Sequence, residues 1–300
     1  MKTDAIRYSE IFHSVQGEGV YTGRQTTWIR LHKCNLMCRG FSQPDPADKT
    51  TWNLEYDDFA NSDEMIKLVQ LEDLPVFKSG CDSYYSWHKA YKHLNHVDTV
   101  ENVVQKIYDC MPNPFSNLNG RSRVEGHFAF TGGEAMLNQN VIVAIVNEMI
   151  ARGNYPKFIT IETNGTQPLT DEFKLFTETV LPENGIELCF SISPKLHHVT
   201  GEDTEKTIRP EVVLDYEKYG DIPYLKFVVN EDERTWNDLY NAIEAYRNVG
   251  VKMDVWGMPC GATVEEQEEN AGRIATRLVN EGFNVSARVH AYLWSNLIGV

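Results

Sequence analysis

The sequence has no long apolar run. No stretch approaches the ~18–20 uncharged apolar residues of a membrane span, and the opening MKTDAIRYSE is too polar for a secretory signal. Basic residues are also scarce, since 28 Lys and Arg stand against 43 Asp and Glu, for a net charge of −15. This acidic excess disfavours a protein that binds nucleic acid along its phosphate backbone. We therefore expect a cytoplasmic protein with neither a membrane nor a nucleic acid as a direct partner.

Cysteine is scarce as well. Six cysteines in 300 residues do not make a disulfide scaffold, because a chain of this length can stabilise itself by burying a core. In a reducing compartment, grouped cysteines more often bind metal or act in catalysis. Cys110 and Cys189 stand in apolar contexts and are expected to be core thiols, whereas Cys260 in GMPCGAT is a candidate for a pocket wall. The remaining thiols are Cys34, Cys38 and Cys81.

The spacing of these three thiols resembles an interrupted iron–sulfur motif. Cys34 and Cys38 are four residues apart, and Phe41 stands where a third thiolate would follow. Cys81 is found about forty residues later, so an insertion from Phe41 to Gly80 would restore the group. Three thiolates leave one iron of a four-iron cluster open for a small molecule. Zinc held by the same cysteines and one of His32, His88 or His93 is the alternative.

From about residue 26 onward, short β-rich runs alternate with amphipathic helical segments. TTWIRLHK reads as a strand, and VENVVQKIYDCM has apolar residues spaced as in a helix. This alternation continues to a last strand in NVSARVHAYLW, and it predicts an α/β fold with a parallel sheet, open or closed into a barrel. The carboxyl ends of such strands carry the chemistry. The motifs at these ends are TGGE, ETNG, SPK and MPCG.

Residues 39–80 break the alternation. The segment opens with turn formers in FSQPDPADKTTWN and continues with the acidic LEYDDFANSDEMIKLVQLEDLP. We expect an inserted lobe with one helix over residues 62–70. A surface excursion without chemistry and a lid or partner-binding lobe are both compatible with this composition.

Several motifs carry candidate ligand-binding groups, each with a structural alternative. In TGGEA, two glycines allow close backbone approach and Glu134 offers a carboxylate to an ammonium group, but Glu134 also suits a helix cap. In VQGEG, Gln16 and Glu18 suit the edge of a heterocycle, or a plain hairpin turn. Arg30 lies in an apolar strand, which requires either a bound anion or a buried ion pair. IETNGT and SISPK add polar groups at two further strand ends, where turns are the alternative.

Together these segments resemble the radical S-adenosylmethionine (SAM) enzymes, and within them the 7-carboxy-7-deazaguanine synthase family. SEIFHSVQGEGVYTGRQTTWIRLHKCNLMC is similar to that family's start, and GCDSYYSW resembles the segment that normally follows its second cysteine. TGGEA, IETNGT, SISPK, YLKFVV and RVHAYLWSNLIGV match later landmarks in order. The resemblance implies a partial (β/α) barrel of the radical SAM type. Residues 1–300 would form a single domain, with residues 39–80 inserted between the second and third cluster cysteines.

The resemblance also implies the ligands. Cys34, Cys38 and Cys81 would hold a [4Fe-4S] cluster, and Ser83 would replace the family's Thr ligand of Mg²⁺. SAM would bind the open iron beside Asp82, Gly133, Glu134, Ser193, Pro194 and Lys195. The substrate, 6-carboxy-5,6,7,8-tetrahydropterin, would be bound by Gln16, Gly17, Glu18, Arg30, Thr131 and His290.

The implied activity is that of a carbon–nitrogen lyase of 7-deazaguanine and queuosine biosynthesis, which forms 7-carboxy-7-deazaguanine with loss of ammonia. An electron donor such as flavodoxin or ferredoxin is an implied partner, a homodimer is compatible with the family, and the inserted lobe is a candidate surface for another protein. Two other functions remain open. A radical SAM activase of a partner protein would share the cluster but not explain Gln16, Glu18 and Arg30 together. A repurposed binding or regulatory protein would act through the lobe without turnover.

Overall fold

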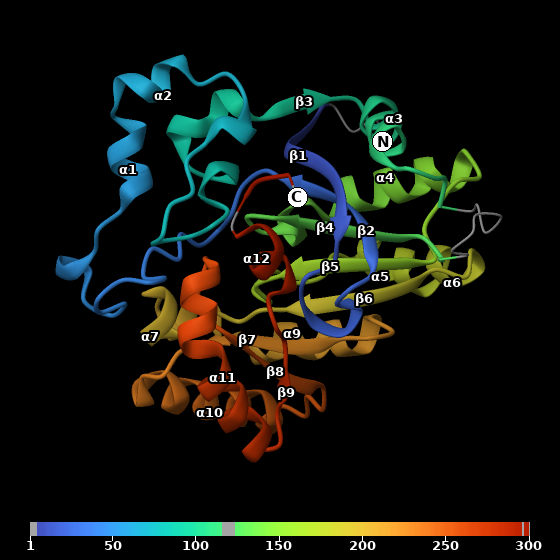
Figure 1. Cartoon of the computed structure of the whole chain (residues 1–300). Coiled ribbons are helices and arrows are strands. Elements are labelled where there is room, and N and C mark those ends of the chain that lie inside the picture. Colours follow the sequence, from blue (N-terminus) through green and yellow to red (C-terminus); the bar gives the residue numbers. More distant parts are fainter. Residues whose placement is uncertain (1–4, 116–123, 296, 300) are drawn as a thin grey trace.

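A mostly parallel sheet forms the centre of the molecule (Figure 1). The computed structural model describes residues 5–115, 124–295 and 297–299. Within them, nine strands form one sheet in the order β3-β1-β2-β4-β5-β6-β7-β8-β9. Neighbouring strands from β2 to β9 are parallel, whereas β1 is antiparallel to both β2 and β3. The strands are β1 (Ile6–Val15), β2 (Gln25–Leu31), β3 (His96–Asp98), β4 (His127–Gly132), β5 (Phe158–Thr163), β6 (Glu187–Ile192), β7 (Tyr224–Val229), β8 (Asp254–Pro259) and β9 (Asn284–Val285).

Helices alternate with the parallel strands, as the sequence predicts. In the helix over residues 100–110, Val103, Val104 and Ile107 are buried on one face, which is the spacing of an amphipathic helix. Its N-cap, Thr99, accepts a hydrogen bond from the Asn102 amide. The α-helices are α1 (Glu55–Ala60), α2 (Asp63–Lys67), α3 (Val100–Cys110), α4 (Gln139–Ala151), α5 (Asp171–Glu178), α6 (Val180–Glu183), α7 (His197–Thr200), α8 (Thr204–Thr207), α9 (Pro210–Tyr219), α10 (Glu233–Asn248), α11 (Val264–Asn280) and α12 (Val289–Trp294). The predicted α/β fold with a largely parallel sheet is confirmed.

Three local features differ from the prediction. Strand β1 was not expected, because Glu10 and His13 interrupt its apolar pattern; both find partners across the ladder, in Arg30 and Thr27. The helix predicted over residues 62–70 is only the five residues of α2. The predicted last strand ends at Val285 and is followed by α12, whose first residue instead donates its amide to Gly17. In the C-terminal motif, Asn296 and Val300 lie outside the described residues.

A second, smaller apolar cluster lies beside the main core. It joins residues 56–74 to the segment that follows Cys81, and Figure 1 shows α1 and α2 standing apart from α10 and α11. The Tyr56 and Tyr84 rings stack with centroids 4.9 Å apart, and the Tyr91 hydroxyl donates to the Tyr56 carbonyl. Its buried members are Tyr56, Met65, Leu71, Leu74, Tyr84, Tyr85, Tyr91 and Leu94.

The two ends of this excursion meet. The Gly80 amide donates a hydrogen bond to the Phe41 carbonyl at 2.8 Å, and Arg39 reaches Asp57 at 3.4 Å. The chain therefore leaves and re-enters the main body at one place, which brings Cys81 back beside the segment of Cys38. No helix in the described ranges is long and apolar enough to cross a membrane.

Candidate functional site

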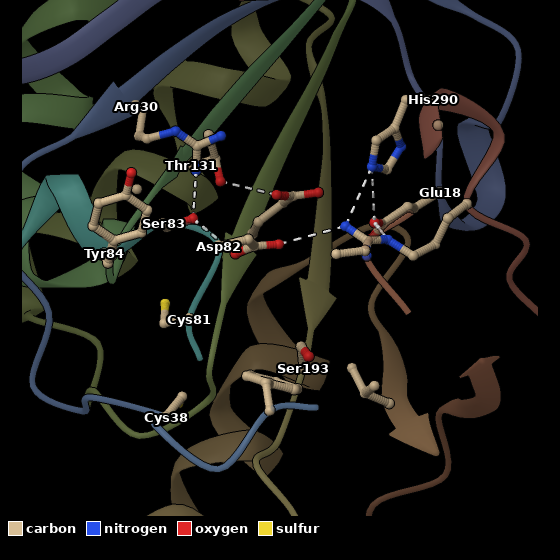
Figure 2. A pocket seen from close by; sticks show the side chains of 18 of the residues that line it. Glu18, Arg30, Cys38, Cys81, Asp82, Ser83, Tyr84, Thr131, Ser193 and His290 are labelled. Carbon is tan, nitrogen blue, oxygen red and sulfur yellow. Dashed lines mark hydrogen bonds and ion pairs between the residues drawn. The ribbon is translucent and has the colours of Figure 1, made fainter. Parts of the chain in front are cut away.

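A cavity of about 290 Å³ opens at the carboxyl ends of the parallel strands. The loops after β4, β5, β6 and β8 contribute to its wall, as expected for a parallel sheet. Figure 2 shows labelled side chains from distant segments turned toward this space. Of the predicted site residues, Glu134 and Pro194 do not line it, and the others do: Gln16, Gly17, Glu18, Arg30, Cys34, Cys38, Cys81, Asp82, Ser83, Thr131, Gly133, Ser193, Lys195 and His290.

The three candidate cluster thiols share this cavity. Burial raises the pKa of Cys34 to about 12 and that of Cys81 to about 11, and it raises the pKa of Cys38 well above its usual range. Repulsion from neighbouring sulfurs contributes at Cys34 and Cys38, and repulsion from the Asp82 carboxylate contributes at Cys81, whereas Lys195 opposes the rise at all three. Without a metal, all three groups are therefore neutral thiols at physiological pH.

The segment from Cys34 to Cys38 is held tightly against the sheet. A Cβ atom on Gly133 would lie 2.5 Å from the Lys33 carbonyl oxygen and 2.6 Å from the Cys34 Cβ. Only glycine fits there. On the other side, the Glu202 carboxylate accepts hydrogen bonds of 2.7 Å from the amides of Met37 and Cys38. This clamp supports the backbone at Cys38, whose φ of 49° lies in the left-handed region.

The turn that carries Gln16 and Glu18 packs against the C-terminal helix. Gly17 approaches the His290 ring so closely that no side chain fits between them, and its carbonyl accepts the Val289 amide at 2.9 Å. The Gln16 side-chain oxygen accepts the Glu18 amide at 3.1 Å. The predicted hairpin turn is therefore present, and it also directs the Gln16 and Glu18 side chains into the cavity wall.

Glu18 is the centre of a buried charge network. It pairs with Lys226 and with Arg288, the latter at 3.2 Å, and His290 lies 3.7 Å away. Burial raises the pKa of Glu18, but these cations outweigh burial and hold it well below its usual range. Arg288 also reaches Asp82 at 3.4 Å (Figure 2). Glu18 is thus a fixed carboxylate, oriented before any ligand binds.

Arg30 has the buried ion pair that its apolar strand requires. Its Nε donates to Glu10 at 2.6 Å. Its Nη1 donates to the Ser83 hydroxyl at 2.9 Å, as Figure 2 shows. Because a guanidinium has about five N–H donors, this pairing leaves Arg30 able to bind a second anion from the cavity. The Ser83 hydroxyl also donates to the Asp82 carboxylate at 3.2 Å, so it lies between a cation and an anion. Its role as a ligand of Mg²⁺ stays a prediction.

Glu134 lies behind the cavity wall. Its side chain is fully buried and accepts hydrogen bonds from the Thr163 hydroxyl at 2.6 Å and the Asn164 amide at 2.7 Å. It also accepts the Met136 amide at 3.0 Å, as a cap of the turn that follows. The carboxylate thus holds two strand ends together here. The Lys195 ammonium, by contrast, lines the cavity and donates to the Ser193 hydroxyl at 3.1 Å.

No family model matches the chain, but curated relatives do. It is 24% identical to the 7-carboxy-7-deazaguanine synthase of Halobacterium salinarum, over 97% of this chain and 91% of the relative. It is also 24% identical to the synthase of Thermoplasma acidophilum, over 97% of this chain and 99% of the relative. The predicted resemblance to the 7-carboxy-7-deazaguanine synthases is confirmed. Among solved structures, the crystal structure of QueE from Escherichia coli aligns with a TM-score of 0.49 and 15% identity, covering 95% of each chain.

The thiols of this synthase-like chain do not share a single-ion site. In the described part of the chain, no group of three or more His, Cys, Asp or Glu side chains is close enough to hold one metal ion. A four-iron cluster does not require its ligands to meet at one point, because each thiolate binds its own iron atom. The three thiols line one cavity wall, Lys195 offsets their charge, and Gly133 fixes the Cys34 segment. This arrangement fits a four-iron cluster.

Four cavity residues were not singled out from the sequence. Lys226 and Arg288 complete the network around Glu18, Glu10 neutralises Arg30, and Glu162 accepts a hydrogen bond from Thr131 at 2.9 Å. Lys226 carried the same signal as Arg30, a charge inside the apolar strand YLKFVV. Arg288 carried a similar signal that was not used, because it stands inside NVSARVHAYLW, the run expected to form the last strand.

Proposed function

We propose that this protein is a radical SAM carbon–nitrogen lyase that converts 6-carboxy-5,6,7,8-tetrahydropterin to 7-carboxy-7-deazaguanine with loss of ammonia. The names of the curated relatives support this reaction. The observation that carries the proposal is the 2.8 Å hydrogen bond between Gly80 and Phe41. This bond brings Cys81 back to the cavity that Cys34 and Cys38 line. Three cysteines that are separated in the sequence therefore lie in one site.

The residues of the cavity wall indicate which cofactors the protein would bind. Cys34, Cys38 and Cys81 would hold a [4Fe-4S] cluster. When bound, the cluster and SAM supply the electron and the hydrogen-abstracting radical. Ser193 and Lys195 offer a hydroxyl and an ammonium to the polar groups of SAM, and Gly133 lets its backbone come close. Asp82 lies next to Cys81 and lines the same wall. Glu134 supports this wall from behind, and Pro194 is buried between the lining residues Ser193 and Lys195 in the chain.

The substrate would be bound by Arg30 and by the turn that carries Gln16 and Glu18. A pterin presents a row of N–H donors and amide-like acceptors, and Glu18 is a carboxylate already fixed to accept from such donors. The Gln16 side chain offers an amide beside it. The donors of Arg30 not used by Glu10 and Ser83 suit the carboxylate of the substrate. Thr131 and His290 complete the wall of this half of the cavity.

The sheet and the lobe are compatible with a radical SAM architecture. The uninterrupted parallel order from β2 to β9 supports a partial (β/α) barrel. The separate apolar cluster and the joined ends support residues 39–80 as a lobe inserted into a single domain. Because residues 75–80 also line the cavity, the lobe would form part of the substrate entrance.

The proposal is tested by turnover without any protein substrate. Anaerobically reconstituted protein is incubated with SAM, dithionite, Mg²⁺ and the carboxytetrahydropterin, and chromatography follows 5′-deoxyadenosine and 7-carboxy-7-deazaguanine. We expect both products. Deoxyadenosine without the deazaguanine, at every pterin concentration, would contradict the proposed substrate and favour another radical reaction such as activation of a protein.

A further inference from the structure

The Arg288 guanidinium lies in the cavity wall between two carboxylates. Arg288 is buried, with 9% of its surface exposed, and it lines the cavity. Its Nε donates to Glu18 at 3.2 Å, and its Nη2 donates to Asp82 at 3.4 Å (Figure 2). Its Nη1 donates to the Gly261 carbonyl at 2.6 Å, in the loop after β8. Three nitrogens of one planar group therefore contact three segments that are distant in the sequence.

The backbone on either side of Arg288 is joined to the turn after β1. The Ser286 hydroxyl accepts the Gly19 amide at 2.9 Å, and the Val289 amide donates to the Gly17 carbonyl at 2.9 Å. The guanidinium therefore starts from a segment that is fixed to the turn of the candidate substrate residues. From there it reaches across to the carboxylate that follows the end of the lobe.

Neither carboxylate needs Arg288 to balance its charge. Glu18 already pairs with Lys226, whose side chain is 5% exposed. The Asp82 side chain is 51% exposed, so water can solvate it. A buried ion pair is often no more stabilising than an apolar contact of similar volume. What a planar guanidinium adds is direction, because its donors hold several acceptors in a fixed geometry. The contacts of Arg288 therefore fix the position of one carboxylate relative to the other.

We propose that Arg288 is a positioning residue that couples the SAM half of the cavity to its substrate half. The inference rests on the proposed function, which puts SAM beside Asp82 and the pterin on Glu18. A ligand that orders one of these carboxylates also orders Arg288, so the second ligand meets a carboxylate already in place. The same contacts set the distance between the two ligands, to which a reaction between them is sensitive.

The first measurement is SAM binding without a reductant, so that no turnover occurs. Anaerobic titration calorimetry on the reconstituted protein gives the SAM dissociation constant with and without 6-carboxy-5,6,7,8-tetrahydropterin. We expect the pterin to tighten SAM binding about fivefold or more in wild type. This factor should fall toward one in both Arg288→Gln and Arg288→Lys. The lysine keeps a cation beside Glu18, but an ammonium is a point charge without the directed fork of a guanidinium.

The second measurement is the amount of 7-carboxy-7-deazaguanine formed per 5′-deoxyadenosine, with dithionite and Mg²⁺ present. We expect this ratio to fall about tenfold or more in both Arg288 variants, while their iron content stays at the wild-type level. A merely structural defect would lower both products in proportion and leave the ratio unchanged. The matched control is Arg277→Gln, because Arg277 also joins two carboxylates, Glu233 and Glu281, but does so away from the cavity on α11. It should keep the wild-type ratio and coupling.

A wild-type coupling factor and product ratio in Arg288→Gln would overturn the inference and leave the proposed function in place. Wild-type values in Arg288→Lys would also overturn it, because a positive charge would then suffice without the geometry of the guanidinium. A pterin that leaves SAM binding unchanged in wild type would show that the two halves are not coupled. Failure of the wild type itself to form any deazaguanine is a separate result, which would remove the proposed function and this role of Arg288 with it.

Discussion

The backbone amide of Gly80 donates to the carbonyl of Phe41 at 2.8 Å, and these two residues lie at the two ends of the inserted lobe. The lobe therefore projects from the rest of the domain, while the segments before and after it stay next to each other. Cys38 and Cys81 are distant in sequence, yet both line one cavity. The long interval between the second and third thiols is thus compatible with one compact site.

The first prediction concerns Gly133. Gly133→Ala places a methyl group against the Lys33 carbonyl and the Cys34 Cβ, so the cysteine segment must shift, at a cost of about 1–3 kcal/mol in unfolding free energy. We expect most of the iron to be lost after reconstitution, measured as iron per chain.

In the control Gly272→Ala, the added Cβ meets no atom within 4 Å. That variant lies in α11 and should keep its iron and gain about 0.5–1 kcal/mol. Wild-type iron content in Gly133→Ala would show that the cysteine segment does not need to pack this closely against Gly133.

The second prediction concerns the clamp at Glu202. Glu202→Ala removes an acceptor shared by the amides of Met37 and Cys38. Hydrogen bonds to a charged group contribute about 1.5–3 kcal/mol, so we expect iron to be lost to a chelator about tenfold faster than from wild type. The exposed Glu205, on α8, gives the control Glu205→Ala. Equal chelation rates in the two variants would show that the clamp does not support the segment.

The third prediction concerns pH and the network around Glu18. Its carboxylate has a lowered pKa in the folded protein, so the network stabilises the fold above the unfolded-state value of 4.5, and this stabilisation is lost as pH falls below it. Glu18→Gln leaves Lys226 and Arg288 without their carboxylate. Removing one partner of a buried pair costs about 3–5 kcal/mol, and we expect this loss at pH 7.

Urea unfolding of wild type and Glu18→Gln at a series of pH values measures this effect. The difference in unfolding free energy should be constant from neutral pH down to about pH 5, and it should narrow steadily as the pH falls further. A difference that stays constant down to pH 3 would mean that the charge of Glu18 does not stabilise the fold.

The sequence was most informative where a local pattern fixes the structure. The helix at residues 100–110 follows from its apolar spacing. The gathering of TGGE, ETNG and SPK at one cavity follows from the geometry of parallel strands. The sequence was less informative where a partner far along the chain decides. Strand β1 tolerates Glu10 only because Arg30 lies across the ladder, and no local signal shows that pairing.

The same limit applies inside the site. Arg288 reaches Glu18 and Asp82 from the far end of the chain, and only the tertiary fold brings these charges together. For Glu134 the sequence left two alternatives open, a ligand contact and a helix cap. The structure shows the cap, because its carboxylate accepts the Met136 amide, and its other donors belong to Thr163 and Asn164. The spacing of a motif thus indicates the type of chemistry more reliably than the direction in which one carboxylate points.

The most direct test of the account measures the cluster itself. Wild type, Cys81→Ala and Cys110→Ala are reconstituted anaerobically, and iron is counted alongside the electron paramagnetic resonance spectrum of the reduced protein with and without SAM. We predict about four irons per chain and a spectrum altered by SAM in wild type and Cys110→Ala, and loss of both in Cys81→Ala. A full cluster with a SAM-altered spectrum in Cys81→Ala would show that the thiol beyond the lobe is not a ligand, and would contradict the account.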